Sequence, residues 1–265
     1  MIEKASKAKL KKIRQILNDK KIRDTEGVFA VEGQKIIKDL FDKNHAFDFV
    51  VFSCDFAQNN ANKNFITKLI QRGVKLFETN DQNFEKISSL KKSQSILAVV
   101  KKPSKLSAES LYEKNALVIF CEGIQDPGNL GAIIRSATAF NAKEIVLTSK
   151  TVDMYNPKVI RASSGTVFDV PVNVGGYKRL DMLKKDGYKI FVSCANSTTA
   201  VEIAKVDKSA GPCVLVFGSE GCGVSKEVEQ RADSMFTIDI SKTVESLNVA
   251  AAVAISLYVF RCSRI

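Results

Sequence analysis

Five polar residues of the C-terminal half have side chains that can bind and polarise a substrate, and they fall in three separate segments: Asn129, Arg135, Glu220, Ser246 and Asn248. Arginine offers a positive fork for phosphate or carboxylate groups, while amide, hydroxyl and carboxylate groups hold donors and acceptors in place. Each segment follows an apolar run that predicts a strand. Because ligands of parallel α/β sheets bind beyond the carboxyl ends of the strands, we expect these loops to form the site.

The first segment, residues 122–131, joins a predicted strand to a helix predicted over Leu130–Phe140. Asn129 is a good N-cap for this helix. Arg135 lies one to two turns further on among Ala and Ile residues, so we expect it to be partly buried with its guanidinium directed out of the loop end. Two roles fit this arginine, namely anion binding or structural pairing with a carboxylate such as Glu220.

The second segment, residues 217–225, has three glycines in six positions, which lets backbone N–H groups face a ligand. It lacks the Lys-Ser/Thr ending of a P-loop and does not match GxGxxG. Glu220 lies in its middle. This carboxylate suits either a partner for Arg135 or a donor on a substrate.

The third segment, residues 238–252, leads into a helix predicted over Leu247–Phe260, for which Ser246 is a good N-cap. The helix is rich in small residues that permit close packing against a backbone or another subunit. Asn248 falls in its first turn, where an amide could reach a ligand. A well-capped buried helix explains the rest of the segment but not this polar residue.

Several kinds of chemistry are disfavoured by what the chain lacks. His45 is its only histidine, so a Ser/His/Asp triad, a histidine-rich zinc site and a histidine-activated cysteine are not expected, and no metal site is predicted. No apolar run is long enough for a membrane helix. The cysteines are far apart and without a CxxC pair, which favours reduced thiols in a soluble, cytoplasmic protein with no membrane partner: Cys54, Cys121, Cys194, Cys213, Cys222 and Cys262.

Positive charge is concentrated in the N-terminal part. Residues 1–103 hold 21 Lys and Arg against 12 Asp and Glu, a net charge of +9, whereas residues 104–265 have a net charge of +2. A basic amphipathic helix is predicted from Glu3 to about Arg23, and the cations considered for RNA binding are Lys9, Lys11, Lys12 and Arg14. This pattern favours a polyanion-binding module, although a merely solvated surface gives the same charge.

Alternating strand and helix signals run through the chain, which predicts an α/β fold. Residues 1–103 form a small alternating unit, and Lys101-Lys102-Pro103-Ser104 interrupts the pattern. We expect a linker over residues 104–114 and a second α/β domain over residues 115–265. The apolar strands of this second domain are those of a parallel sheet covered on both faces.

Three segments taken together resemble the motifs of the SpoU family of RNA ribose 2′-O-methyltransferases, also called the TrmH family, of the SPOUT superfamily. They are DPGNLGAIIRSATAF (126–140), VFGSEGCGVS (216–225) and IDISKTVESLNVAAAVAISLY (238–258). FAVEGQKIIKDL (29–40) and QSILAVV (94–100) are similar to the RNA-binding domain that often precedes this catalytic domain.

The resemblance implies methyl transfer from S-adenosylmethionine to a ribose 2′-hydroxyl of RNA. It implies a small N-terminal α/β sandwich that binds RNA, followed by a SPOUT-type α/β domain with a C-terminal trefoil knot and a homodimer through the knotted domain. Cofactor-binding residues would be Gly218, Ile238, Leu247 and Thr148, and catalytic residues would be Asn129, Arg135, Glu220, Ser246 and Asn248. Arg135 would also bind RNA through the phosphate beside the reacting ribose, and Glu220 would orient it.

Three functions remain open at this point. Methylation of ribosomal RNA is favoured over the same reaction on tRNA because of the fused N-terminal domain. A non-catalytic RNA-binding or ribosome-assembly factor that retains the fold is the third, but all five catalytic residue types are intact.

Overall fold

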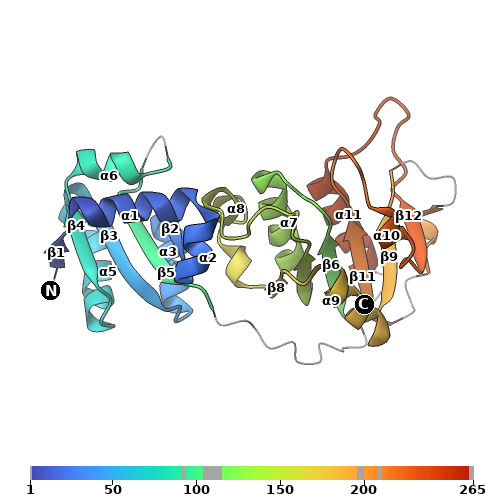
Figure 1. Ribbon diagram of the computed structural model, residues 1–265, viewed down its shortest axis with the longest axis horizontal. Helices are drawn as coiled ribbons and strands as arrows, with labels where there is room; N and C mark the ends of the chain where they lie inside the picture. The colour runs from blue at the N-terminus through green and yellow to red at the C-terminus, as the bar shows by residue number, and fades with distance from the viewer. Residues whose placement is uncertain (1, 91–92, 104–114, 196–199, 208–210, 263–265) are drawn as a thin grey trace. The chain divides into compact units, whose positions relative to one another are not determined.

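The computed structural model describes residues 2–90, 93–103, 115–195, 200–207 and 211–262. It divides into two compact units, one formed by residues 1–106 with 155–157 and the other by residues 107–154 with 158–265 (Figure 1). The predicted linker, residues 104–114, lies outside the described residues.

The N-terminal unit is built on a five-stranded sheet in the order β1-β4-β3-β5-β2. Strand β5 runs antiparallel to both β2 and β3, while β1, β4 and β3 are parallel to one another. The strands are β1 (Ile2–Lys4), β2 (Val28–Glu32), β3 (Phe47–Ser53), β4 (Leu76–Thr79) and β5 (Ile96–Lys101).

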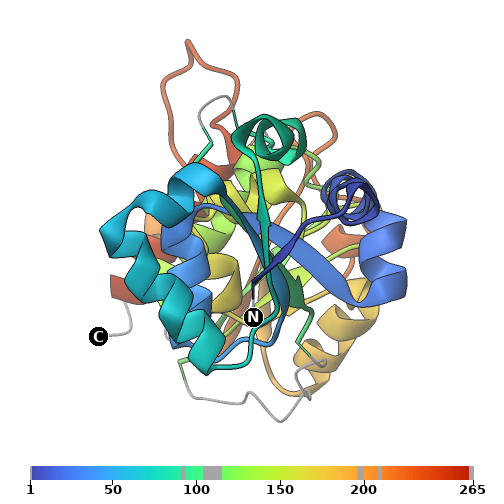
Figure 2. The same cartoon turned by 90° about the vertical axis from the view of Figure 1, so that its left-hand side faces the viewer.

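Helices lie on both faces of this sheet, as Figure 2 shows. Leu10, Ile13 and Ile16 of α1 pack with Phe84 of α6 in one core under strands β2 to β5, whereas α3 contacts β2 and β5. The helices are α1 (Lys7–Asn18), α2 (Lys20–Glu26), α3 (Gln34–Asp42), α4 (Cys54–Gln58), α5 (Asn60–Gln71) and α6 (Asp81–Ile87).

The predicted single helix from Glu3 to Arg23 is wrong, because the segment forms a strand and two helices. β1 pairs with β4, and the Ser6 hydroxyl then caps α1 by accepting from the Lys9 N–H at 3.2 Å. Asp19 ends α1 and caps α2 through a 2.7 Å bond from the Lys21 N–H. Residues with strong capping side chains therefore divide a segment whose apolar spacing alone is continuous.

The C-terminal unit is built on a seven-stranded sheet in the order β10-β12-β9-β11-β6-β7-β8, and every neighbouring pair is parallel. The strands are β6 (Leu117–Cys121), β7 (Glu144–Leu147), β8 (Val172–Asn173), β9 (Lys189–Ser193), β10 (Val201–Glu202), β11 (Cys213–Phe217) and β12 (Ser234–Thr237). The predicted parallel α/β sheet is confirmed, and the short edge strands β8 and β10 are additions to it.

Helices cover both faces of this sheet (Figure 1). Leu180, Leu183 and Val228 of α9 and α10 pack on one face, while Phe260 of α11 contacts Phe191 and Phe236 on the other. Helix α11 also packs against α7. The helices are α7 (Pro127–Ala139), α8 (Pro157–Ala162), α9 (Gly176–Lys185), α10 (Lys226–Glu229) and α11 (Val249–Cys262), with 3-10 turns over Thr166–Phe168 and Ile203–Lys205.

Two predicted caps are wrong. Asp126 caps α7, whose first residue is Pro127, so Asn129 lies inside the first turn. Helix α11 begins at Val249 rather than near Leu247, and the Asn248 side chain accepts from the Ala250 N–H at 2.9 Å in the place predicted for Ser246. Both helices therefore begin at an Asx residue close to the predicted one. None of the described helices is long and apolar enough to cross a membrane.

Candidate active site

Three loops of the C-terminal unit carry the predicted site, and each leaves the carboxyl end of a strand. The loop after β6 leads into α7, whose first turn holds Asn129. The loop after β11 leads into α10 and holds Glu220, and the loop after β12 leads into α11 and holds Asn248. β6 and β11 end together, because Cys121 pairs with Phe217 in the parallel register. The loops therefore start from one edge of the sheet.

A chain of hydrogen bonds joins one residue from each loop. The Asn248 Nδ2 group donates to Asn129 Oδ1 at 2.9 Å, and Asn129 Nδ2 donates to Glu220 Oε1. The Ala250 N–H donates to Asn248 Oδ1 at 2.9 Å, and the Asn129 N–H donates to Asp126 Oδ1 at 2.8 Å. Residues 91 and 119 positions apart in the sequence thus form one polar chain, as the three predicted motifs require.

Tight packing fixes the start of α7 beside these loops. A Cβ atom at Gly131 would lie 2.4 Å from the Ala162 Cβ and 2.8 Å from the Val159 carbonyl oxygen of α8. Only glycine permits that approach. Asn129 is therefore set by its own cap and by the contact of α7 with α8, rather than by a mobile loop.

A cavity of about 590 Å³ opens beside the polar chain. Its walls combine apolar side chains with loop backbone, which is typical of a site for a small organic ligand. The residues that line it come from the ends of β9, β11 and β12, the loops that follow, the end of α10 and the start of α11. Among them are Gly218, Glu220, Ile238, Ser246 and Leu247.

The loop after β11 is folded tightly at the wall of this cavity. Ser219 and Gly223 exchange two backbone hydrogen bonds of 3.1 and 2.8 Å. A Cβ atom at Gly218 would lie 2.0 Å from the Gly223 carbonyl oxygen, so no other residue fits there. The glycines thus close the turn and leave its backbone facing the cavity.

The cavity has a negative lining. Glu220, Glu229 and Glu245 border it, and no lysine or arginine is among the lining residues that the structure describes. Burial raises the pKa of the Cys194 thiol, and the Glu229 carboxylate raises it further. A ligand that carries positive charge is therefore favoured.

Arg135 does not meet the expectation of partial burial. Its side chain is exposed on α7, and within the described part of the chain it has no hydrogen-bond or ion-pair partner. Six helical positions separate it from Asn129, which sets the two side chains about 120° apart around α7. Glu220 therefore contacts Asn129 and does not orient Arg135, contrary to the prediction.

The other predicted residues divide between the cavity and the framework. Gly218, Ile238, Leu247 and Ser246 line the cavity. Thr148 is not among the lining residues, because it is buried after β7, where its hydroxyl accepts from the Gly123 N–H at 3.1 Å and bonds the Thr151 hydroxyl at 3.2 Å.

The predicted RNA-binding cations of α1 have different surroundings. The Lys9 ammonium lies 3.9 and 4.4 Å from the ring centroids of Phe77 and Phe49. Lys12 pairs with Glu26, and Arg14 Nε donates to the Lys86 carbonyl oxygen at 2.8 Å. Of these four, Lys11 alone is exposed without such a contact in the described structure.

Glu229 and Cys194 also line the cavity, although no sequence pattern predicted them as site residues. Glu229 ends the four-residue helix α10, and Cys194 follows β9. Neither stands in a glycine-rich segment. The one signal available was that Cys194 follows an apolar strand at the same edge as the three loops.

Comparison with known families agrees with this arrangement. Residues 116–258 match the SpoU rRNA Methylase family, and residues 7–98 match the MRM3-like substrate binding domain. The first match spans more than half of the chain. The chain belongs to the SpoU family.

Curated relatives are similar in sequence to this SpoU family member over nearly its full length. It is 28% identical to the 23S rRNA (guanosine(2553)-2'-O)-methyltransferase RlmP of Bacillus subtilis (strain 168), over 98% of each chain. It is 27% identical to the 23S rRNA (guanosine-2'-O-)-methyltransferase RlmB of Coxiella burnetii, over 90% of this chain and 94% of that one.

A solved structure shows the same fold over both units. The AdoMet-bound rRNA methyltransferase from Sinorhizobium meliloti superposes with a TM-score of 0.88 at 24% identity, covering 100% of this chain and 99% of that chain. At this identity the likeness establishes a shared fold for both units.

Proposed function

We propose that this SpoU family member transfers a methyl group from S-adenosylmethionine to a ribose 2′-hydroxyl of ribosomal RNA. The observation that carries the proposal is the polar chain Asn248–Asn129–Glu220, which reaches a negatively lined cavity through Glu220. Three motifs contribute to it, one residue each. A binding protein that had lost the reaction would have no need to keep all three in contact.

The cavity fits S-adenosylmethionine, which carries a positive sulfonium and a positive amino group. Glu220, Glu229 and Glu245 provide opposite charge, and Phe217, Ile238 and Leu247 provide apolar surface for an adenine ring. When bound, the cofactor supplies an electrophilic methyl group. The chain's own residues must hold the ribose hydroxyl in line with it.

Asn129, Asn248 and Ser246 hold the ribose and cofactor in reacting geometry. The two amides bond each other, and each has a second partner that fixes its orientation. Asn248 Oδ1 accepts from the Ala250 N–H, and Asn129 Nδ2 donates to Glu220 Oε1. Arg135 binds the phosphate beside the ribose and stabilises the negative charge that develops on the 2′-oxygen. Its guanidinium supplies five donors and a permanent positive charge for this purpose.

A homodimer through the C-terminal unit accounts for the position of Arg135. Helix α11 has exposed residues at helical spacing, Ala251, Ile255, Tyr258 and Cys262, and the Ile255 and Tyr258 side chains are 38% and 59% exposed. These residues form one exposed face of α11, whose other face packs within the unit. The exposed face could pack against a second copy of the chain. The exposed Arg135 then acts in the site of the partner subunit.

Mixed dimers test this arrangement. Arg135→Ala chains and Asn129→Ala chains are each expected to be inactive as homodimers. Mixing them regains up to half of the wild-type activity per mixed dimer, since one of its two sites then has both residues. No regain in a mixture shown to exchange subunits would contradict the partner's contribution.

The substrate is ribosomal RNA rather than tRNA because relatives that match at full length act on ribosomal RNA by name. The basic N-terminal unit, with its match to a substrate binding domain, provides affinity for that RNA. The protein then works in the cytoplasm on the ribosomal RNA.

Labelled S-adenosylmethionine with purified ribosomal RNA or tRNA tests the function directly. We expect label in alkali-resistant ribose of ribosomal RNA and none in tRNA. Label in tRNA alone would favour the alternative substrate. No label with either RNA or with ribosomal assembly intermediates, from protein that binds the cofactor, would leave a binding or assembly factor.

A further inference from the structure

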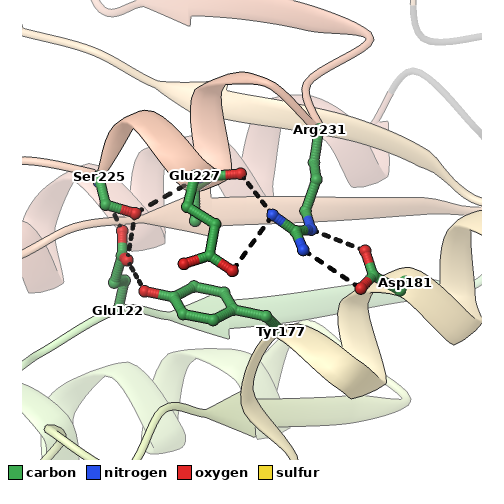
Figure 3. A network of polar contacts seen from close by, with 7 residues as sticks. Glu122, Tyr177, Asp181, Ser225, Glu227 and Arg231 are labelled. Carbon is green, nitrogen blue, oxygen red and sulfur yellow. Dashed lines mark hydrogen bonds and ion pairs between the residues drawn. The ribbon is translucent and has the colours of Figure 1, made fainter.

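Glu122 is a buried carboxylate that none of the three predicted motifs includes. It directly follows β6, and its side chain is 7% exposed. Figure 3 shows three donors directed at it. The Ser225 N–H donates to Oε2 at 2.8 Å, the Ser225 hydroxyl donates to Oε1 at 2.7 Å, and the Tyr177 hydroxyl donates to Oε1.

These bonds hold the end of the loop that follows β11. Ser225 is the last residue of that loop and the N-cap of α10, where its hydroxyl oxygen also accepts from the Val228 N–H at 3.4 Å. Val224 and Glu229, on either side of the cap, both line the cavity. A helix of four residues is not stable by itself, so its cap at Ser225, together with the buried Val228, sets both lining residues.

The near end of the same loop is also held beside Glu122. The Glu122 N–H donates to the Phe217 carbonyl oxygen at 2.9 Å, where β11 ends. The backbone of Glu122 therefore fixes the entry to the loop, and its side chain fixes the exit. Between these two points lie Gly218 and Glu220, which line the cavity.

Hydrogen bonds alone hold the charge of Glu122, since the described structure gives it no ion-pair partner. A buried carboxylate is costly unless its oxygens are satisfied, so this side chain has a strong preference for one loop position. Burial and the bond to Glu122 raise the pKa of Tyr177, which keeps that phenol as a donor.

We propose that Glu122 is a positioning residue that fixes the cofactor-binding loop, through Ser225, in its ligand-ready form. The proposal rests on the proposed function, in which this cavity holds S-adenosylmethionine. Glu122 acts through Ser225 and α10 and does not touch the ligand. Its loss leaves the loop able to adopt other positions, and cofactor affinity falls because binding must then order the loop.

Glu144 is a matched control in the same unit. It is also buried, at 3% exposure, but it starts β7 and pairs with Arg179 through bonds of 2.7 to 3.1 Å. Its partners belong to α9 and not to a cavity-lining loop. A variant at Glu144 therefore reports the effect of disturbing a buried carboxylate without disturbing Ser225.

Calorimetric titration of the full-length protein with S-adenosylmethionine measures the effect. In Glu122→Ala we expect the Kd to rise about tenfold, because the partly buried donors of Ser225 and Tyr177 lose their acceptor and no longer hold the loop. Glu122→Gln keeps an acceptor for the Ser225 N–H, so it restores most of the affinity. Tyr177→Phe leaves both Ser225 bonds in place and changes the Kd less than about twofold.

A merely structural role would give a different result. Glu144→Gln is expected to lower the Tm while leaving the cofactor Kd of the folded protein unchanged. If Glu122→Ala lowers the Tm in the same way with an unchanged Kd, the proposal is wrong. Should Glu122→Ala not fold, Ser225→Ala provides the same test, with a Kd about threefold higher expected from loss of the hydroxyl bond and an unchanged Kd contradicting it. Wild-type protein that fails to bind S-adenosylmethionine would instead overturn the proposed function.

Discussion

The basic helix of the N-terminal unit and the three loops of the C-terminal unit use their polar residues differently. In α1, Lys9, Lys12 and Arg14 contact aromatic rings, a carboxylate and a carbonyl oxygen of their own unit. In the C-terminal unit, Asn129 and Asn248 come from distant segments to bond each other at 2.9 Å. Side chains that follow strands at one edge of a parallel sheet converge, whereas cations along a helix are divided between packing and solvent.

The largest effect is expected at Arg135. Arg135→Ala removes the charge that stabilises the developing oxyanion, so methyl transfer falls by about 10³-fold or more while cofactor Kd stays nearly unchanged. Rates at saturating cofactor and RNA, with cofactor titrations alongside, measure both. Lys150→Ala is the control, because Lys150 is another exposed cation of this unit that does not line the cavity. Appreciable turnover by folded Arg135→Ala protein would contradict the assigned role.

The next effect separates the cations of α1. Replacing Lys9, Lys11 and Lys12 together by Glu is expected to weaken RNA binding and to flatten its salt dependence. Lys11→Glu alone should reduce the slope of log K against log salt by about 1. Lys12→Ala, which frees Glu26 from its pair, should have the smaller effect on RNA. Filter binding over a series of salt concentrations measures these RNA affinities. An unchanged slope in the triple variant would show that these lysines are solvated and do not contact RNA.

An alkaline transition is expected in the C-terminal unit. Burial raises the pKa of Cys121 to about 12, from about 9 for an exposed thiol. The folded state therefore binds a proton that the unfolded state releases, so stability is full below pH 9 and falls as the pH rises toward 12. By pH 10.5 this costs about 2 kcal/mol. Thermal unfolding from pH 8 to 10.5 should show a shallower decline in Cys121→Ala, whose Tm is lower throughout; equal slopes would contradict it.

The smallest effect concerns the packing of Lys9. Lys9→Met keeps the aliphatic stem over Phe49 and Phe77 but removes the ammonium, and we expect the free energy of unfolding to fall by about 0.5–1 kcal/mol. Urea unfolding measures it. Lys11→Met is the matched exposed control and should leave stability unchanged. Equal free energies of unfolding for the two variants would show that the Lys9 ammonium does not stabilise the unit through these rings.

The strands and the order of the elements could be predicted because apolar runs such as residues 213–217 are buried on both faces and have no other place in a soluble fold. Helix starts were less predictable. Asp126 and Asn129 are both capping residues, and Pro127, which suits the first position of a helix, favours the first. The short edge strands β8 and β10 have two residues each, too few for a periodic signal.

The motifs predict five catalytic residues, and their roles stay predictions, but the contacts among them could not be predicted. Glu220 is equally well suited to an arginine or an amide, and the angular separation along α7 gives it Asn129. Glu122 had no signal, since an acidic residue after a strand gains meaning only when Ser225, 103 positions away, is brought beside it. The trefoil knot and the homodimer stay predictions from the resemblance.

Single-turnover methylation by Asn129→Ala, beside wild type, tests most directly whether the polar chain is the reaction centre. RNA and S-adenosylmethionine are both held at saturation, and their Kd values are measured separately. We predict a rate about 100-fold lower, with both Kd values within about threefold of wild type, because Asn129 orients the reacting groups and does not line the cavity. A wild-type rate in the folded variant would contradict the account.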